Sequence, residues 1–327
     1  MTATPQAFYE VRDISDWPEF SEEPQGGKKK CWLLEPLTFA PSASGLSSPS
    51  RHAKERRWLF KDRAQGGDDW AERVAQEVAQ ALKLPCSEVV LVERAGVLGM
   101  MSLDFTDNRS HGDLVLGNEL LLEMDPQYPS GRRFRFGAHT VDKVVGALRD
   151  SEIGLPASLQ GQLATAAELF VGYLLLDALI GNTDRHHENW GILRHPTLER
   201  PRWATLAPSF DHAASLGQIL QDSERVQRLS TRDVSYTVAA YSSKARSALF
   251  SREGDKRPLL LMEALLAAGR LLSHGATFWQ SALSEVSQHF LDRCVDKVPA
   301  KMASEPAKRF AKAMLAVNRQ KILEVQF

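Results

Sequence analysis

Cysteine is scarce in this chain of 327 residues. Only Cys31, Cys86 and Cys294 are present, widely separated and odd in number. Neither a disulfide framework nor a Cys-x-x-Cys metal site can be drawn from them. Such sparse use of cysteine is typical of proteins that reside in the reducing cytoplasm.

The chain also lacks an excess of either charge. Its 40 lysines and arginines are balanced by 41 aspartates and glutamates, which leaves a net charge of −1. There is no overall basic field of the kind that attracts nucleic acid, so direct nucleic-acid binding is not expected.

Long apolar runs and a secretory leader are missing as well. The N-terminus has no basic segment followed by an apolar one, and Glu168 and Asp177 interrupt the longest apolar run, residues 163–180. We therefore expect a soluble cytoplasmic protein that does not associate with membranes. With 43% hydrophobic residues, the chain can bury a core of ordinary size, in two lobes or two small domains.

The most informative stretch is residues 177–191, in which Asp184 and Asn189 lie five positions apart on a polar turn. Asp211 follows within the length of one hairpin. This spacing suits a phosphoryl-transfer site. Asp184 would be the catalytic carboxylate beside the substrate hydroxyl, while Asn189 and Asp211 would hold Mg²⁺ against the phosphates of a nucleotide. The stretch therefore predicts a kinase.

The flanking segments are expected to bring these side chains together. Residues 160–180 are apolar nearly all round, which predicts a buried central helix ahead of Asp184. Residues 190–193 and 203–206 can pair as a hairpin, which would place Asn189 and Asp211 at neighbouring ends.

The first third of the chain has the pattern of a small antiparallel sheet that carries one helix. Strand-like patterns lie at residues 7–14, 31–35, 58–61, 87–93 and 96–105, and helical spacing of apolar residues occurs at 69–83.

Within this part, Lys61 ends a compact apolar strand and Glu72 lies on the helix that follows. A strand lysine followed by a helix glutamate is the arrangement in which an ion pair holds an ammonium against nucleotide phosphates. Taken alone, Lys61 would more often be an exposed lysine at the end of a strand. The downstream motif with Asp184 and Asn189 instead favours a lysine that contacts a nucleotide. Glu77 is a rival for Glu72 on another face of the same helix.

Two further segments are candidates for contact with a nucleotide. Gly26, Gly27 and Lys30 belong to a loop between two strands that can bring backbone N–H groups and positive charge close to phosphates. An ordinary hairpin is the commoner origin of such glycine pairs. Leu103 and Asp104 lie in the connection whose backbone would meet the adenine ring in a kinase-like lobe.

After Asp107 the composition becomes helical. This places a boundary near residue 106, between an N-terminal nucleotide-binding lobe (residues 1–105) and a C-terminal helical catalytic lobe (residues 106–327). Helices are predicted at residues 115–124, 138–149, 160–180, 257–273, 276–296 and 304–324. Residues 40–52 are low in complexity and are interpreted as a surface insertion.

A different chemistry has to be weighed for the central stretch. Histidines beside carboxylates also build hydrolytic metal centres, here with His186, His187, Glu188, His212 and Asp211 as ligands. Adjacent histidines on a turning segment point in divergent directions, however, and the helical His-Glu-x-x-His spacing is missing. A metal hydrolase is therefore the weaker hypothesis.

Two cationic clusters have two explanations each. Residues 244–247 (Lys-Ala-Arg-Ser) could contact an anionic substrate or a phosphate, and lysines and arginines recur along residues 301–321. A solvated face is the commoner explanation for both, because most charged side chains are simply exposed.

The motif stretches resemble the HipA-like serine/threonine kinases, bacterial proteins with a protein-kinase-like fold that often act as toxins beside an antitoxin. Residues 179–190 are similar to the catalytic loop of that family, and residues 206–212 to its metal-binding segment. Residues 58–61 look like its lysine strand, and residues 72–84 like the helix that follows. The resemblance runs from about residue 24 to about residue 250.

This resemblance implies ATP and Mg²⁺ as cofactors, Asp184 as the catalytic carboxylate, Asn189 and Asp211 as metal ligands, and Lys61 on the α- and β-phosphates. It also implies a protein substrate, such as a translation factor or an aminoacyl-tRNA synthetase, and a possible antitoxin partner.

The chain differs from the longer members of that family in two respects. Its first strand is predicted near residue 7, so we expect the extra N-terminal subdomain to be absent, as in the short forms. Residues 26–30 contain no serine that could be autophosphorylated.

We predict a two-lobed α+β protein of protein-kinase-like fold that transfers the γ-phosphoryl of ATP to a serine or threonine hydroxyl of a protein. One alternative is a kinase of a lipid head group or another small molecule. The other is a nucleotide-binding pseudokinase that serves as a partner-binding module, although retention of Lys61, Asp184, Asn189 and Asp211 argues against it.

Overall fold

The computed structural model describes most of the chain. The described residues are 8–22, 30–36, 56–63, 66–106, 112–132, 137–195, 197–200 and 203–327. The predicted phosphate loop with Gly26 and Gly27, and the predicted insertion at residues 40–52, lie outside them.

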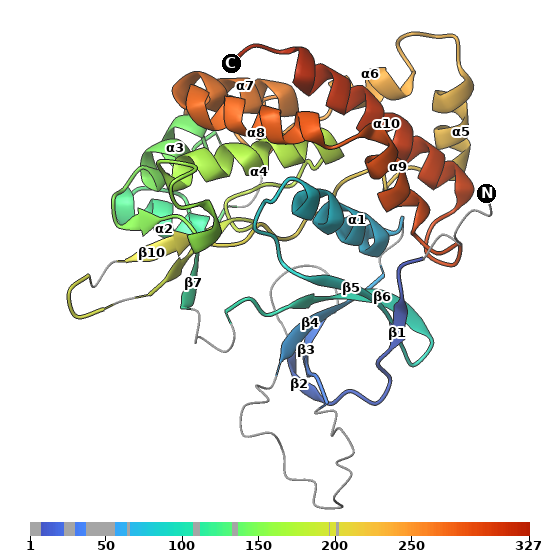
Figure 1. The fold of residues 1–327 in the computed structure, drawn as a ribbon, viewed down its shortest axis with the longest axis horizontal. Coiled ribbons are helices and arrows are strands. Elements are labelled where there is room, and N and C mark those ends of the chain that lie inside the picture. Colours follow the sequence, from blue (N-terminus) through green and yellow to red (C-terminus); the bar gives the residue numbers. More distant parts are fainter. Residues whose placement is uncertain are drawn as a thin grey trace, which may run out of the picture.

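A six-stranded sheet forms the first lobe (Figure 1). In spatial order its strands are β1 (Val11–Asp13), β5 (Val89–Arg94), β6 (Val97–Leu103), β4 (Arg57–Asp62), β3 (Lys30–Leu34) and β2 (Glu19–Glu22). The expected sheet was entirely antiparallel and lacked β2. The structure instead pairs β1 with β5 in parallel and adds β2 at the edge, where all four of its residues are exposed. Such a strand carries no apolar alternation from which it could be predicted.

One helix, α1 (Asp68–Ala81), covers the sheet, as predicted. Apolar residues at helical spacing, among them Ala71, Val74 and Val78, are fully buried on its inner face. The helix contacts β5 and β6 on one side and α4 (Ala166–Ile180) and α9 (Gln288–Asp296) on the other, so it lies between the sheet and the helical lobe (Figure 1).

The second lobe is mainly helical. Besides α4 and α9 it contains α2 (Gly117–Met124), α3 (Val141–Leu148), the short 3₁₀ helix η1 (Ala157–Leu159), α5 (Asp222–Ser230), α6 (Val238–Ser243), α7 (Leu261–Leu271), α8 (Ser273–Glu285) and α10 (Glu305–Glu324). All 15 residues of α4 are buried, and α3, α7, α8 and α10 pack around it. The prediction of a buried central helix is confirmed, although α4 begins at its N-cap Thr165 rather than near residue 160.

The helical lobe also contains a small second sheet. Its strands, in order, are β7 (Asp113–Leu116), β9 (Gly191–Arg194), β10 (Ala204–Leu206) and β8 (Ile153–Gly154). The predicted hairpin is present, because β9 and β10 are antiparallel with Leu193 opposite Thr205. It delivers Asn189, just before β9, and Asp211, after β10, to the same end of the sheet.

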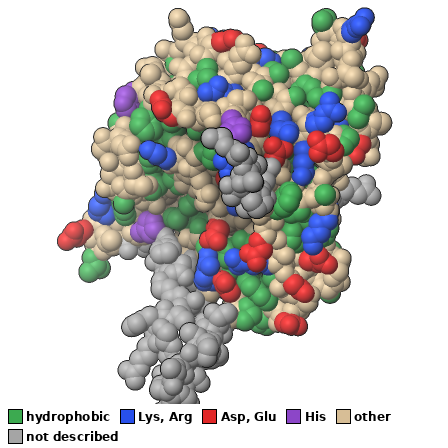
Figure 2. Space-filling view, turned by 45° about the vertical axis from the view of Figure 1, so that its right-hand side comes forward, with side chains coloured by type: hydrophobic (Ala, Val, Ile, Leu, Met, Phe, Trp, Pro, Cys, Tyr) green, Lys and Arg blue, Asp and Glu red, His purple; other side chains and the backbone are tan. Residues whose placement is uncertain are grey.

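Side chains of both charges occur together on the visible surface. On the face shown in Figure 2, lysines and arginines are interspersed with aspartates and glutamates. In the part of the chain that the structure describes, no helix combines the length and the apolar character needed to cross a bilayer.

Candidate active site

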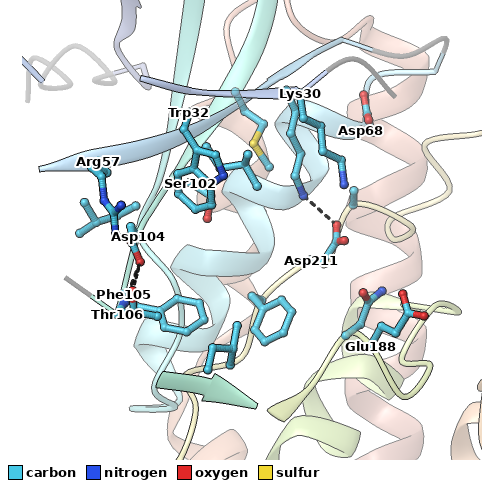
Figure 3. Close-up of a pocket in the computed structure, with 18 of the residues that line it drawn as sticks. Lys30, Trp32, Arg57, Asp68, Ser102, Asp104, Phe105, Thr106, Glu188 and Asp211 are labelled. Atoms are coloured by element: carbon cyan, nitrogen blue, oxygen red, sulfur yellow. Dashed lines mark hydrogen bonds and ion pairs between the residues drawn. The ribbon is translucent and has the colours of Figure 1, made fainter. Parts of the chain in front are cut away.

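A cavity of about 1000 Å³ opens between the two lobes. Its walls include, from the sheet lobe, Lys30, Trp32, Arg57, Lys61, Asp68, Ser102, Leu103, Asp104 and Phe105, and, from the helical lobe, Asp113, Asp184, His186, Glu188, Asn189, Phe210 and Asp211. In Figure 3 the aromatic and connecting residues lie at one end of the cavity, and Lys30, Asp68, Asp211 and Glu188 at the other. The volume is large enough for a nucleotide.

Lys61 and Asp211 form the ion pair that joins the two lobes across this cavity. Lys61 is buried on β4, and its Nζ lies 3.1 Å from Asp211 Oδ1 (Figure 3). Burial alone would raise the pKa of Asp211, but the charges of Lys61 and Lys30 outweigh it and hold the pKa well below its usual range. Burial likewise opposes the charge of Lys61, but Asp211 and then Glu72 raise its pKa. Both groups are therefore ionised at neutral pH.

The backbone of Asp211 is in the left-handed region, with a φ of +57°. Few residues other than glycine adopt this conformation. It costs free energy and persists only where the surrounding structure enforces it. Here it turns the chain sharply. The carboxylate of Asp211 meets Lys61, and the side chain of the next residue, His212, is buried.

Glu72 differs from the prediction. It does not pair with Lys61; its Oε1 lies 3.3 Å from His212 Nδ1, with both side chains buried. His212 Nε2 also forms a hydrogen bond of 2.7 Å with Ser209 Oγ. Glu72 still raises the pKa of Lys61 through its charge. Sequence reasoning missed this pairing because His212 is adjacent to Glu72 only in space.

A buried ion pair shapes the loop that carries Asp184 and Asn189. Arg185 is 1% exposed and donates two hydrogen bonds to Asp177 of α4, of 2.9 Å to Oδ2 and 2.7 Å to Oδ1. Its remaining nitrogen donates to the backbone carbonyls of Asn189, at 2.9 Å, and Phe210, at 3.4 Å. One guanidinium thus connects the central helix, the loop and the residue that precedes Asp211.

The side chain of Asn189 has a defined orientation. Its Nδ2 donates a hydrogen bond of 2.7 Å to the backbone carbonyl of Asp184, so its carbonyl oxygen is the atom left to act as a ligand. Asp184 has a partly exposed carboxylate on the cavity wall, 3.9 Å from His186 Nε2. The structure therefore brings Lys61, Asp184, Asn189 and Asp211 to one cavity.

The connection between the lobes is more constrained than expected. Leu103 and Asp104 line the cavity, but the N–H of Leu103 donates to Glu88 and that of Asp104 to Arg57. The carboxylate of Asp104 pairs with Arg57 at 2.7 Å. Within the described residues, the N–H of Phe105 donates to no acceptor, which makes it the available backbone donor at this end.

Phe105 belongs to residues 102–105, the connection that was expected to meet the adenine, but Phe210 was not anticipated as a site residue. Their ring centroids are 5.6 Å apart, and both rings line the cavity. They form an apolar surface in the cavity, and in Figure 3 Phe105 lies at the end away from Lys30. Only the position of Phe210 beside Asp211 in the sequence could have indicated its part in the site.

Carboxylates outnumber cations on the cavity wall. The wall carries three cations, Lys30, Arg57 and Lys61, and eight carboxylates: Asp62, Asp68, Asp69, Asp104, Asp113, Asp184, Glu188 and Asp211. A polyanion such as a nucleotide triphosphate would need additional positive charge to enter. The available ligands, an amide oxygen and carboxylates, are those that hard divalent cations prefer.

The hydrolase hypothesis finds no support in the described part of the chain, where no cluster of three or more metal-ligating side chains occurs. His187 Nδ1 is 2.8 Å from the hydroxyl of Tyr128, and His212 contacts Ser209 and Glu72. These imidazoles serve as internal hydrogen-bonding groups.

Together, the fold and the arrangement of the cavity define a two-lobed protein of protein-kinase-like architecture, as predicted. No known protein family and no curated protein matches the sequence. Among solved structures, the fold is similar to that of the Helicobacter pylori proinflammatory kinase CtkA, with a TM-score of 0.66, 20% identity, and coverage of 97% of this chain and 96% of that one. At this identity the likeness shows a shared fold.

A second structure, HipA in a complex of the Shewanella oneidensis MR-1 toxin-antitoxin system with HipB and operator DNA, is more distant. It gives a TM-score of 0.43 at 12% identity and covers 98% of this chain and 70% of that one.

Proposed function

We propose that this protein is a kinase that uses ATP and Mg²⁺ to phosphorylate a serine or threonine hydroxyl of a protein. The observation that carries the proposal is the convergence of Lys61, Asp184, Asn189 and Asp211 on one cavity between the lobes.

Each end of the cavity suits one part of ATP. The apolar surface of Phe105 and Phe210 suits the adenine ring, and the N–H of Phe105 is available to donate to it. Lys61 and Lys30 supply positive charge for the phosphates at the other end. When the phosphates bind Lys61, its present partner Asp211 is released to act as a ligand.

The donor atoms at the phosphate end fit a magnesium ion. Asn189 offers its carbonyl oxygen and Asp211 its carboxylate, which the lowered pKa keeps ionised. When bound there, Mg²⁺ would supply positive charge that neutralises the phosphates. The charge of a bound Mg²⁺ would also explain why carboxylates are in excess on a wall that has to accept a polyanion.

Asp184 would act on the acceptor. Its carboxylate orients the substrate hydroxyl toward the γ-phosphorus and accepts the hydroxyl proton as the new O–P bond forms. The bond between the γ-phosphorus and the β,γ-bridging oxygen breaks, and ADP leaves with the electron pair of that bond. Most of the rate acceleration comes from positioning and charge neutralisation.

Transfer of labelled phosphate from [γ-³²P]ATP to protein, in a cell extract or to the protein itself, tests the proposal. Asp184→Asn and Asp211→Asn should each lower the rate by at least about a hundredfold, in the range expected for loss of a catalytic or charge-stabilising group. Asp142→Asn removes an exposed carboxylate that does not line the cavity and should leave the rate unchanged.

Three results would contradict this function. Wild-type labelling that persists in both site variants would place the chemistry elsewhere. Binding of ATP without any phosphate transfer, to protein or to extracted lipid, would show a pseudokinase, and transfer to lipid alone would change the class of acceptor.

A further inference from the structure

A second cavity, of about 660 Å³, adjoins the candidate active site. It is lined by the segment just before Asp184, the segment that follows Asp211, the region of α5 and α6, and Met314 of α10. None of the site residues discussed above belongs to it.

The position of this cavity relates it to the acceptor. Thr183, which lines it, immediately precedes Asp184, and the N–H of Thr183 donates a hydrogen bond of 3.2 Å to the carbonyl of Ala214. Ala214 and Gln218 line both cavities. A chain that places a hydroxyl beside Asp184 can therefore continue into the second cavity.

The charge of the second cavity is opposite to that of the first. Its lining residues, all in the described part of the chain, include Arg228, Lys244 and Arg246 but no aspartate or glutamate. The guanidinium of Arg228 lies over two tyrosine rings, 3.9 Å from the centroid of Tyr236 and 5.0 Å from that of Tyr241.

None of these three cations belongs to an ion pair within the described residues. Lys244 Nζ donates to the carbonyl of Ser235 at 3.3 Å, and Arg246 donates to the carbonyl of Pro258 at 2.5 Å. Their charge is therefore not neutralised by a carboxylate in contact. Hydrogen bonds from Ser235 lower the pKa of Asp233, and the charge of Lys244 lowers it by a smaller amount.

A buried hydroxyl provides a second, independent observation. Ser215 is 2% exposed and lines the cavity, yet its Oγ has no hydrogen-bond partner. Buried polar groups are nearly always satisfied, so this hydroxyl is a free donor beside the cavity. The Oγ atom is itself covered, so a rotation of the side chain would bring it to a ligand bound there.

We propose that the second cavity binds an acidic segment of the protein substrate, next to the serine or threonine that is phosphorylated. This inference rests on the proposed kinase function and specifies its substrate class. Glutamate or aspartate side chains would be held by Lys244 and Arg246, with Ser215 donating to one carboxylate. The acidic wall of the first cavity disfavours the same segment there, which gives the substrate a single orientation.

Binding of a fluorescein-labelled peptide with glutamates on both sides of one serine provides the test. Fluorescence anisotropy on the full chain should show that Lys244→Gln/Arg246→Gln weakens binding about tenfold, as two charge contacts of this kind allow. A matched control, Lys256→Gln/Arg257→Gln, removes the same charge from neighbouring exposed positions that do not line the cavity and should leave binding unchanged.

A library of serine peptides, phosphorylated by the wild type and the same variants, reports on catalysis. The wild type should favour acidic neighbours, and Lys244→Gln/Arg246→Gln should lose the preference through a higher KM for the peptide, with the KM for ATP unchanged. Equal binding of the glutamate peptide by both double variants, or phosphorylation with no acidic preference, would overturn this inference and leave the kinase function standing. Peptide binding that depends on Lys244 and Arg246 without any phosphate transfer would instead contradict the kinase function alone.

Discussion

Asp211 is the residue on which the cavity depends most. Its left-handed backbone costs about 1–3 kcal/mol for a residue with a side chain. Contacts on both sides enforce it: Arg185 holds the carbonyl of Phe210, and His212 is fixed between Ser209 and Glu72. The carboxylate is thereby held toward Lys61 before any ligand binds.

Arg185 permits a test that separates stability from activity. Arg185→Met leaves Asp177 as an unpaired buried charge and should lower the free energy of unfolding by about 3–5 kcal/mol. Asp177→Leu/Arg185→Met removes both charges and should recover most of that loss. It should remain inactive in phosphate transfer, because no guanidinium then holds the carbonyls of Asn189 and Phe210. Urea unfolding and labelled ATP measure the two effects, and an active double variant would contradict the positioning role.

His139 makes stability depend on pH. Burial lowers its pKa from 6.5 to about 3. Its Nε2 accepts a hydrogen bond from Trp190 Nε1, and its Nδ1 lies 3.1 Å from the carbonyl of Ala248, so the ring is neutral in the folded protein. Because the folded pKa is lower than the unfolded one, the stability is fully present above about pH 6.5 and is lost as pH falls toward 3.

From this group alone we expect a loss of roughly 2 kcal/mol between pH 7.5 and pH 5, an order-of-magnitude figure obtained from the shift. Urea unfolding at the two pH values measures it. His139→Gln can keep both hydrogen bonds but does not titrate, so its stability should change less with pH. An identical change in the variant would show that His139 is not the group responsible.

At the scale of elements, α4 is packed on every side, and Gly172 shows how closely. A Cβ at this position would lie 2.6 Å from atoms of Leu84 and Trp279. In an exposed helix, Gly→Ala stabilises by about 0.5–1 kcal/mol, but here overpacking should make Gly172→Ala destabilising by about 1–3 kcal/mol. Gly146, exposed on α3 with no atom within 4 Å of the same position, is the control and should give the ordinary gain. Chemical unfolding of both variants measures the difference, and equal gains would mean that α4 is loosely packed.

Elements with strong apolar periodicity were predictable from the sequence, and those defined by long-range pairing were not. The spacing in α1 and the all-round apolar character of α4 indicated both helices correctly. The single helix expected at residues 276–296 is two, α8 and α9, because Ser287 caps the second by accepting from the N–H of Phe290. The parallel pairing of β1 with β5 joins segments far apart in the chain, which no local pattern reveals.

The site shows the same division. The spacing of Asp184, Asn189 and Asp211 indicated their common cavity, since a local hairpin brings them together. The tertiary fold, and no local pattern, pairs His212 with Glu72. It also brings Arg228, Lys244 and Arg246 together around a second cavity. Exposure to solvent was the commoner explanation for residues 244–247, and Lys244 and Arg246 are indeed exposed; the sequence did not indicate that they line a cavity together with Arg228.

At the scale of the whole molecule, contacts on the α1 side hold the two lobes in place. Arg63, just after β4, donates to the carbonyls of Lys301 and Met302 at 3.2 and 3.0 Å. Lys297 pairs with Glu77 of α1 at 2.5 Å. These contacts join the sheet lobe to the segment between α9 and α10, so that Lys61 faces Asp211 across the cavity.

A crystal structure of the protein with a non-hydrolysable ATP analogue and Mg²⁺ would show whether the cavity between the lobes is the nucleotide site. We expect the triphosphate within hydrogen-bonding distance of Lys61 Nζ, the metal at about 2.1 Å from Asn189 Oδ1 and an Asp211 oxygen, and the adenine between the lobes near Phe105. A nucleotide bound outside this cavity, or a metal held by His186 and His187 instead, would contradict it.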